Sequence, residues 1–171
     1  TQPSSRKCFA AFVFPSLIPG CLLAPLASAP QFGPFSYTSD GSAITITQYT
    51  GEGVVVAIPS TIGGLPVRVI GDSAFERKAL NRVTIPNSVS HIGKYAFSNC
   101  TNLTGMVIPD SVTSIGERAF QFCSALTSLT LSRGAASIGM YAFNACSALT
   151  SVLIPNTVTL IDEGAFAGCT R

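Results

Sequence analysis

Residues 100–122, CTNLTGMVIPDSVTSIGERAFQF, set a pattern that returns along the chain every 23 residues. Cysteines mark the period at positions 100, 123, 146 and 169, and Arg77 stands one period before the first of them. Ile-Pro, Ile-Gly and Ala-Phe pairs recur in similar register on both sides of this stretch. A regular period of this length indicates a tandem array of structural repeats, about five of them in this chain.

The apolar pattern of each unit predicts its local structure. Residues 126–131, LTSLTL, end in alternating apolar and polar residues, which predicts a short half-buried strand. In most units a proline follows this strand, and its missing backbone donor should end the ladder there. Residues 112–115 then return across the layer. We predict one or two turns of helix over 117–123, with the alanine, one phenylalanine and the cysteine facing inward.

One such unit cannot bury its apolar face alone, so the units should stack with their strands about 4.8 Å apart. The N-terminal end of the stack needs a cover, because an open ladder exposes backbone and core. Residues 35–38 and 43–47 alternate as strands on either side of a turn signal at 39–41. We therefore expect an N-terminal β-hairpin cap within 30–49, followed by the repeats over 50–171.

The repeated pattern, Cys-x-x-Leu-x-x-(Val/Leu/Met)-x-Ile-Pro-x-Ser-Val-x-x-Ile-Gly-x-x-Ala-Phe, resembles the BspA-like class of leucine-rich repeats over about residues 50–171. The resemblance implies a repeat solenoid of the leucine-rich-repeat type, with short parallel strands plus short helical turns. It also implies a secreted or cell-surface protein, because the better-known members of the class are adhesins that bind host matrix proteins or other cells. The class has no catalytic motif to carry over, so the resemblance implies no enzyme and no cofactor.

Residues 1–29 are interpreted as an export signal. They open with a basic pair, continue as a largely apolar run over 8–26 and end in the small residues 27–29. Two alternatives stay open, namely a lipoprotein signal with the lipid on Cys21 and an unprocessed leader. The final residues look like the opening of another repeat, so we expect the protein to continue past Arg171. Any attachment to a membrane would then come from the leader or from that continuation.

Composition and spacing argue against several kinds of chemistry. The formal net charge is only +2 and there is no basic run, so nucleic-acid binding is not expected. A row of cysteines at one repeat position does not converge on a point, so we expect buried, reduced thiols and no metal site. A disulfide between adjacent repeats is the alternative. His91 is the only histidine, and no catalytic set can be assembled around it.

The remaining candidates are strand residues predicted to point outward. Alternation along the strands predicts a mostly uncharged outward stripe, made of Arg82, Thr84, Gly105, Val107, Ser128, Thr130, Ser151 and Leu153. Arg133 joins it as a possible ligand contact, because the third repeat departs from the pattern there. Tyr95 and Tyr141 form a second candidate patch on the opposite side. The alternative to a binding stripe is a plain solvated sheet.

These observations predict a non-enzymatic protein- or glycan-binding domain of an exported, adhesin-like protein. We expect a monomer whose partner is an extracellular protein or glycan, with no nucleic acid and no cofactor. The alternative is a structural spacer or stalk for a functional region beyond residue 171. A catalytic domain further along the protein is a third hypothesis, which nothing in residues 1–171 supports.

Overall fold

A computed structural model describes residues 29–131 and 133–171. The predicted export signal therefore lies almost wholly outside the described residues. The described chain forms fourteen strands and contains no helix. The strands are β1 Gln31–Phe32, β2 Phe35–Ser39, β3 Ile44–Tyr49, β4 Val55–Ala57, β5 Thr61–Ile62, β6 Leu65–Ile70, β7 Arg82–Thr84, β8 His91–Ile92, β9 Gly105–Ile108, β10 Ser114–Ile115, β11 Ser128–Leu131, β12 Ser137–Ile138, β13 Ser151–Leu153 and β14 Leu160–Ile161.

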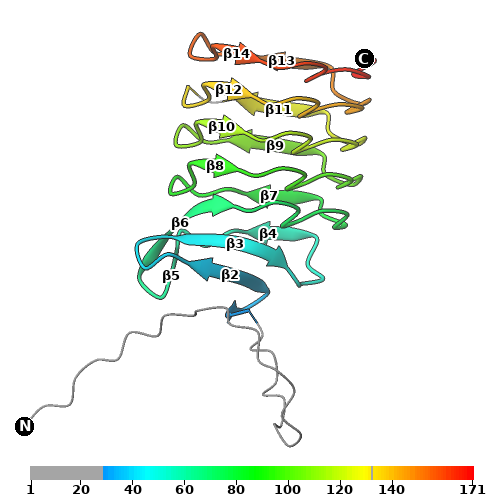
Figure 1. The fold of residues 1–171 in the computed structure, drawn as a ribbon. Coiled ribbons are helices and arrows are strands. Elements are labelled where there is room, and N and C mark those ends of the chain that lie inside the picture. Colours follow the sequence, from blue (N-terminus) through cyan, green and yellow to red (C-terminus); the bar gives the residue numbers. More distant parts are fainter. Residues whose placement is uncertain (1–28, 132) are drawn as a thin grey trace, which may run out of the picture.

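The strands form two sheets on opposite sides of a stack of rungs (Figure 1). The five-stranded sheet runs β13-β11-β9-β7-β4, and all its neighbours are parallel. The second sheet runs β1-β2-β3-β6-β8-β10-β12-β14, with β5 attached to β6. Repeat-equivalent residues pair directly, as Ser114 does with Ser137. The predicted solenoid of short parallel strands is thus confirmed, and the predicted strand in 126–131 is β11.

The predicted helical turns are wrong. Residues 117–123 form successive tight turns, in which alternate backbone N–H groups donate to the next rung: that of Arg118 to the carbonyl of Met140, that of Phe120 to Ala142 and that of Phe122 to Asn144. A helix would direct all of these donors along its own axis. Arg118 and Phe122 have φ values of 53° and 60°, which a right-handed helix does not allow. Inter-rung bonding therefore replaces helical bonding in this segment.

The inward side of the turn segment is as predicted. Ala119, Phe120 and Cys123 are fully buried. The rings of Phe75, Phe97, Phe120, Phe143 and Phe166 stack in a ladder, with centroids 4.9–5.3 Å apart. Apolar columns of Leu, Ile, Val and Met fill the rest of the interior. Burial of these repeated positions is the main stabilising term, because each rung covers the apolar face of the next.

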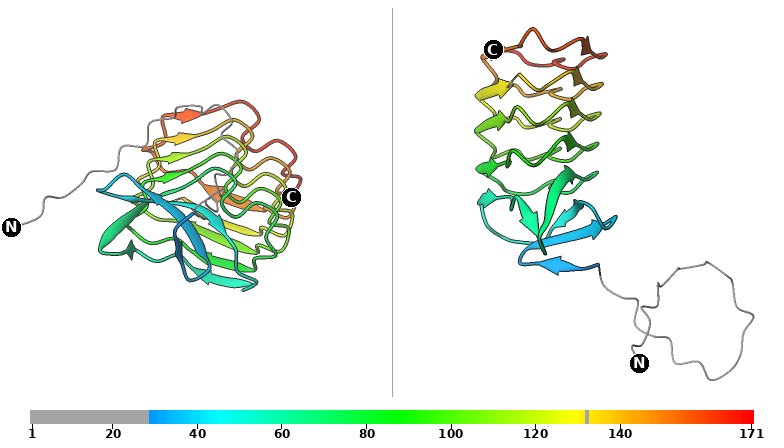
Figure 2. Two further views of the ribbon diagram at one scale, coloured as in Figure 1. Left: turned by 60° about the horizontal axis from the view of Figure 1, so that its bottom comes forward. Right: turned by 90° about the vertical axis from the view of Figure 1, so that its left-hand side faces the viewer.

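The N-terminal cap is an antiparallel hairpin, as predicted. β2 pairs with β3, and β1 adds a short third strand. Figure 2 shows this hairpin crossing the N-terminal end of the stack. Tyr49 from β3 stacks on Phe75 with centroids 5.3 Å apart, so a cap residue extends the phenylalanine ladder by one ring. The cap therefore closes the core as well as the edge of the second sheet.

The first unit differs from the others by one residue, which corrects the alignment of Arg77. The N–H of Lys78 donates to the carbonyl of Phe75, just as the N–H of Cys100 donates to that of Phe97. Arg77 instead shares its left-handed conformation with Asn99. Lys78, not Arg77, therefore occupies the cysteine position. Counting back 23 residues from Cys100 gives Arg77 instead of Lys78, because the first unit lacks one residue before its repeated leucine, Leu80.

Candidate binding face

The outward side of the five-stranded sheet presents two columns of side chains, which we call the sheet face. The first column pairs in register from Val55 through Arg82 and Gly105 to Ser128 and Ser151. The second column holds Ala57, Thr84, Val107, Thr130 and Leu153. Apart from the half-buried Gly105, all of these residues are exposed. Alternation along each strand places them outward because the intervening residues enter the core.

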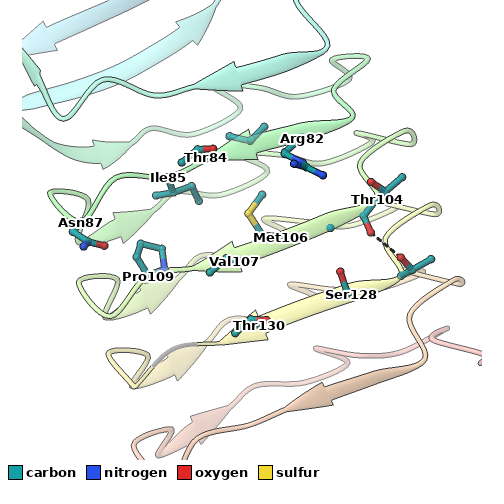
Figure 3. Close-up of a pocket in the computed structure, with 13 residues that line it drawn as sticks. Arg82, Thr84, Ile85, Asn87, Thr104, Met106, Val107, Pro109, Ser128 and Thr130 are labelled. Carbon is teal, nitrogen blue, oxygen red and sulfur yellow. Dashed lines mark hydrogen bonds between the residues drawn. The ribbon is translucent and has the colours of Figure 1, made fainter.

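A shallow groove of about 570 Å³ lies on this face, across β7, β9 and β11 (Figure 3). Its outward-pointing lining comes from Arg82, Thr84, Gly105, Val107, Ser128 and Thr130, and its rim includes Asn87, Thr104 and Thr127. Gly105 explains the hollow. No side chain projects from Gly105 in an otherwise continuous column, and the Ser128 hydroxyl borders this position, because a Cβ here would lie only 2.9 Å from Ser128 Oγ.

The structure separates the predicted site residues into those that line the groove, those elsewhere on the sheet face, and Arg133, which lies off that face. Arg82, Thr84, Val107, Ser128 and Thr130 meet in the groove. Ser151 and Leu153 extend the sheet face on β13 but lie outside the groove, and Leu153 is the most exposed large hydrophobic residue of the described chain, at 82%.

Arg133 does not join the sheet face. It follows the end of β11, where its N–H donates to Asp110 Oδ1 over 2.7 Å. The adjacent Gly134 is held so close to the neighbouring rung that a Cβ would lie 1.6 Å from the carbonyl oxygen of Asp110. The departure of the third repeat from the pattern therefore has a local structural cause, and the groove does not include Arg133.

Two residues of the face were missed from the sequence. Val55 and Ala57 of β4 begin the two columns, and Val55 is 67% exposed. The signal was present, because 55–59 reads VVAIP and ends in the same Ile-Pro pair as the later strands. The inserted hairpin β5–β6 interrupts the period after this strand and separates it from the regular repeats.

The second candidate patch is already filled by a neighbour. The guanidinium of Arg118 lies between the rings of Tyr95 and Tyr141, 5.7 and 5.4 Å from their centroids, and donates to the Tyr95 hydroxyl. Arg118 also pairs with Glu117 at 3.3 Å. The hydrogen bond to Glu117 likewise raises the pKa of Lys94. Tyr95, Arg118 and Tyr141 form an inter-rung stack, which we call the Arg118 stack, and not an open site.

Cys100, Cys123 and Cys146 of the cysteine column are buried, as predicted, and Cys169 is half-buried. Each thiol donates to a backbone carbonyl of the preceding rung, and that of Cys123 reaches Phe97 O over 3.2 Å. Burial raises the pKa of the Cys100 and Cys146 thiols to about 12, so both are protonated at neutral pH and poor as nucleophiles or metal ligands.

Neither a metal-binding cluster nor a membrane-spanning helix is found in the described part of the chain. No cluster of His, Cys, Asp and Glu in residues 29–131 and 133–171 could hold a metal ion. His91 lies on the second sheet with its Nδ1 2.8 Å from Ser90 Oγ. Over these same ranges, no helix has the length and hydropathy required to cross a bilayer.

Comparison with known proteins gives matches that agree with this architecture. Residues 67–171 match the family model described as a BspA type leucine rich repeat region (6 copies). A search of curated protein sequences gives no significant match.

Among solved structures, a leucine-rich repeat protein of T. pallidum is similar, with a TM-score of 0.78 and 38% identity over 82% of this chain and 67% of that chain. A leucine rich cell surface protein from Faecalibacterium prausnitzii gives a TM-score of 0.62 and 33% identity over 82% of this chain. This chain covers 46% of that protein. The pneumococcal vaccine antigen PcpA shares the fold alone, at 18% identity and a TM-score of 0.60.

Proposed function

Because the chain belongs to the BspA-type leucine-rich repeat family, we propose that it is a non-enzymatic binding domain of an exported cell-surface or secreted protein. Its sheet face would contact an extracellular protein or glycan, as a monomer and without a cofactor. One observation carries the proposal: the two exposed columns run in register across five strands and contain a groove at Gly105. Extended solenoid surfaces of this kind commonly serve as binding faces.

The chemistry of the groove supports binding rather than catalysis. Hydroxyl and aliphatic side chains line it together with one cation, Arg82. His91, the residue best suited to act as a base near neutral pH, lies on the other sheet. A ligand lying across several rungs would make many weak contacts with the sheet face. A few central residues would supply most of the binding energy.

Export is supported by two observations. The leader predicted at 1–29 has the pattern of a secretory signal. The Faecalibacterium relative, 33% identical, is described as a cell surface protein.

An array of purified extracellular-matrix proteins and glycans tests the proposal. The wild-type chain is compared with Arg82→Glu and Thr130→Glu, which place a negative charge in the groove. Arg68→Glu and Thr61→Glu are the matched controls, because both residues are exposed on β6 and β5, away from the groove. We expect a wild-type ligand whose binding falls at least tenfold in the groove variants and stays unchanged in the controls. Equal binding by all five proteins would exclude the sheet face as the site.

A spacer role is the second candidate. The stacked rings at 4.9–5.3 Å and the inter-rung hydrogen bonds give a stiff, continuous rod. Such a rod could hold another region of the protein away from a surface. The same array distinguishes the two functions, because a pure spacer binds no component of it.

A further inference from the structure

Arg82 stands out on the sheet face because it is the only charged residue there. The ten residues of the two columns include no acid and no aromatic ring, and the groove rim is also uncharged. The three ion pairs of the described residues lie elsewhere. The Arg82 guanidinium makes no side-chain hydrogen bond or ion pair within that part of the chain, in contrast to Arg118.

The groove places this cation beside a gap and a hydroxyl. Arg82, Gly105 and Ser128 are consecutive members of one column, on adjacent strands. Figure 3 shows the Arg82 side chain extending from β7 toward β9, and Ser128 pointing toward β9 from the other side. Both therefore border the space above Gly105, and the Ser128 hydroxyl lies at its edge. A group that enters this space meets a guanidinium on one side and a hydroxyl on the other.

The groove also has an apolar part at a fixed spacing from that gap. Val107 is two residues along β9 from Gly105, points to the same side and is 60% exposed. Residues i and i+2 of an extended strand project to one face about 6.8 Å apart. An extended peptide bound along β9 would therefore place the side chain of one residue over Gly105. The side chain two residues along the peptide, on the same face, would lie over Val107.

We propose that the groove binds an extended polypeptide segment containing an acidic residue and an aliphatic residue two positions apart. The carboxylate accepts hydrogen bonds from the Arg82 guanidinium and the Ser128 hydroxyl, in the space over Gly105. A planar guanidinium suits this contact, because it can bind a carboxylate through two parallel hydrogen bonds. The aliphatic side chain packs against Val107. This assignment rests on the proposed function, of which it names the ligand class.

A polypeptide fits the face better than a carbohydrate does. The sheet face offers exposed aliphatic carbon at Val55, Val107 and Leu153, to which aliphatic side chains can pack. It offers no aromatic ring on which the face of a sugar could stack. An anionic glycan could still pair with Arg82, so a sulfated glycan is included in the test as the competing ligand.

The test is selection from a displayed library of random ten-residue peptides, with heparin measured separately by biolayer interferometry. Wild type and Arg68→Glu serve as matched targets, and Arg82→Glu is the groove variant. We expect the first two to enrich peptides with an Asp or Glu two positions from Val, Leu or Ile. These peptides should bind Arg82→Glu at least tenfold more weakly, and selection on that variant should favour Lys or Arg instead.

Gly105→Val supplies an independent variant. Its added Cβ meets only the movable Ser128 hydroxyl at 2.9 Å, so the fold should tolerate it while the gap is filled. We expect the selected peptides to lose at least tenfold in affinity, with an unchanged circular dichroism spectrum. If Gly105→Val is misfolded by that spectrum, the Arg82→Glu comparison decides alone, because Arg82 is exposed.

The outcomes separate this inference from the proposed function. Peptides that need Thr130 but show no acidic residue and no dependence on Arg82 would overturn the inference and leave the sheet face as a binding site. Binding of heparin with no enrichment of acidic peptides would assign the groove to a glycan, which also overturns it. If the wild type selects no peptide and binds neither heparin nor any component of the protein and glycan array, both proposals fail.

Discussion

Two arginines on different sides of the solenoid have opposite surroundings. Arg118 lies in a stack with Tyr95 and Tyr141 and pairs with Glu117. Arg82 lies beside a gap and has no such partner within the described residues. In a repeat protein, equivalent positions of adjacent rungs satisfy one another, so a polar group normally finds its partner one rung away. Arg82 combines a missing partner with a place in the groove, and it is this combination that supports a ligand there.

The sheet face and the Arg118 stack should both be held in place by the same core, the phenylalanine ladder. The prediction with the largest expected effect tests this dependence. Phe120→Ala removes a fully buried ring from the centre of the ladder, so we expect the free energy of unfolding to fall by about 3–5 kcal/mol. Guanidinium denaturation followed by circular dichroism measures it. Phe122→Ala is the control, because Phe122 is 45% exposed and should cost far less. Equal losses in the two variants would contradict the ladder as the shared core.

The next largest expected effect is the difference in stability between substitutions of Arg118 and Arg82. Arg118→Met keeps most of the apolar stem but removes the charge between two rings, so the denaturation midpoint should fall clearly. The same change at Arg82 removes no side-chain hydrogen bond or ion pair within the described residues, and stability should change by less than about 0.5 kcal/mol. Denaturation midpoints of the two variants measure the difference. A loss at Arg82 as large as that at Arg118 would show that Arg82 has a structural role.

Enlarging one buried alanine should have a smaller effect on stability, and it should stabilise the fold. Ala135 is fully buried where neighbouring rungs have Val89 and Val112. Ala135→Val should restore two methyl groups to that column and raise stability by about 1 kcal/mol. Ala142→Val is the control, because its column contains only alanine, and overpacking there should cost about 1–3 kcal/mol. A loss at both positions would mean that the third repeat has already closed the space at Ala135.

The sequence predicted what depends on the period, and failed where backbone conformation decides. Stacked parallel strands and the buried thiols follow from repeated apolar positions, and the hairpin cap follows from alternation on either side of a turn signal. The turn segment did not, because its apolar spacing fits a helix equally well and residues such as Arg118 rarely adopt positive φ. A signal existed in the last unit, where Gly164 and Gly168 hold the two left-handed positions, with φ values of 61° and 73°.

The candidate site was only partly predictable for a related reason. Alternation along the strands identified Arg82, Ser128 and Thr130 as outward residues. It did not predict a groove, because the hollow at Gly105 depends on how adjacent rungs align. Arg133 was included because its repeat is irregular, yet its backbone donates to Asp110 and the residue lies outside the groove. The irregular repeat therefore coincides with a local packing constraint, and Arg133 remains a prediction outside the groove.

The smallest expected effect separates exposed charge pairs from the Arg118 stack. Lys94 Nζ lies 3.0 Å from Glu117 Oε2, but the lysine side chain is 59% exposed and water competes for its charge. Lys94→Met should therefore leave the denaturation midpoint almost unchanged, and any shift should shrink further in 1 M salt. Denaturation with urea, an uncharged denaturant, at low and high salt measures it. A salt-insensitive loss as large as that of Arg118→Met would mean that Lys94 belongs to the stack, and that charge on this side is stabilised by more than the two rings.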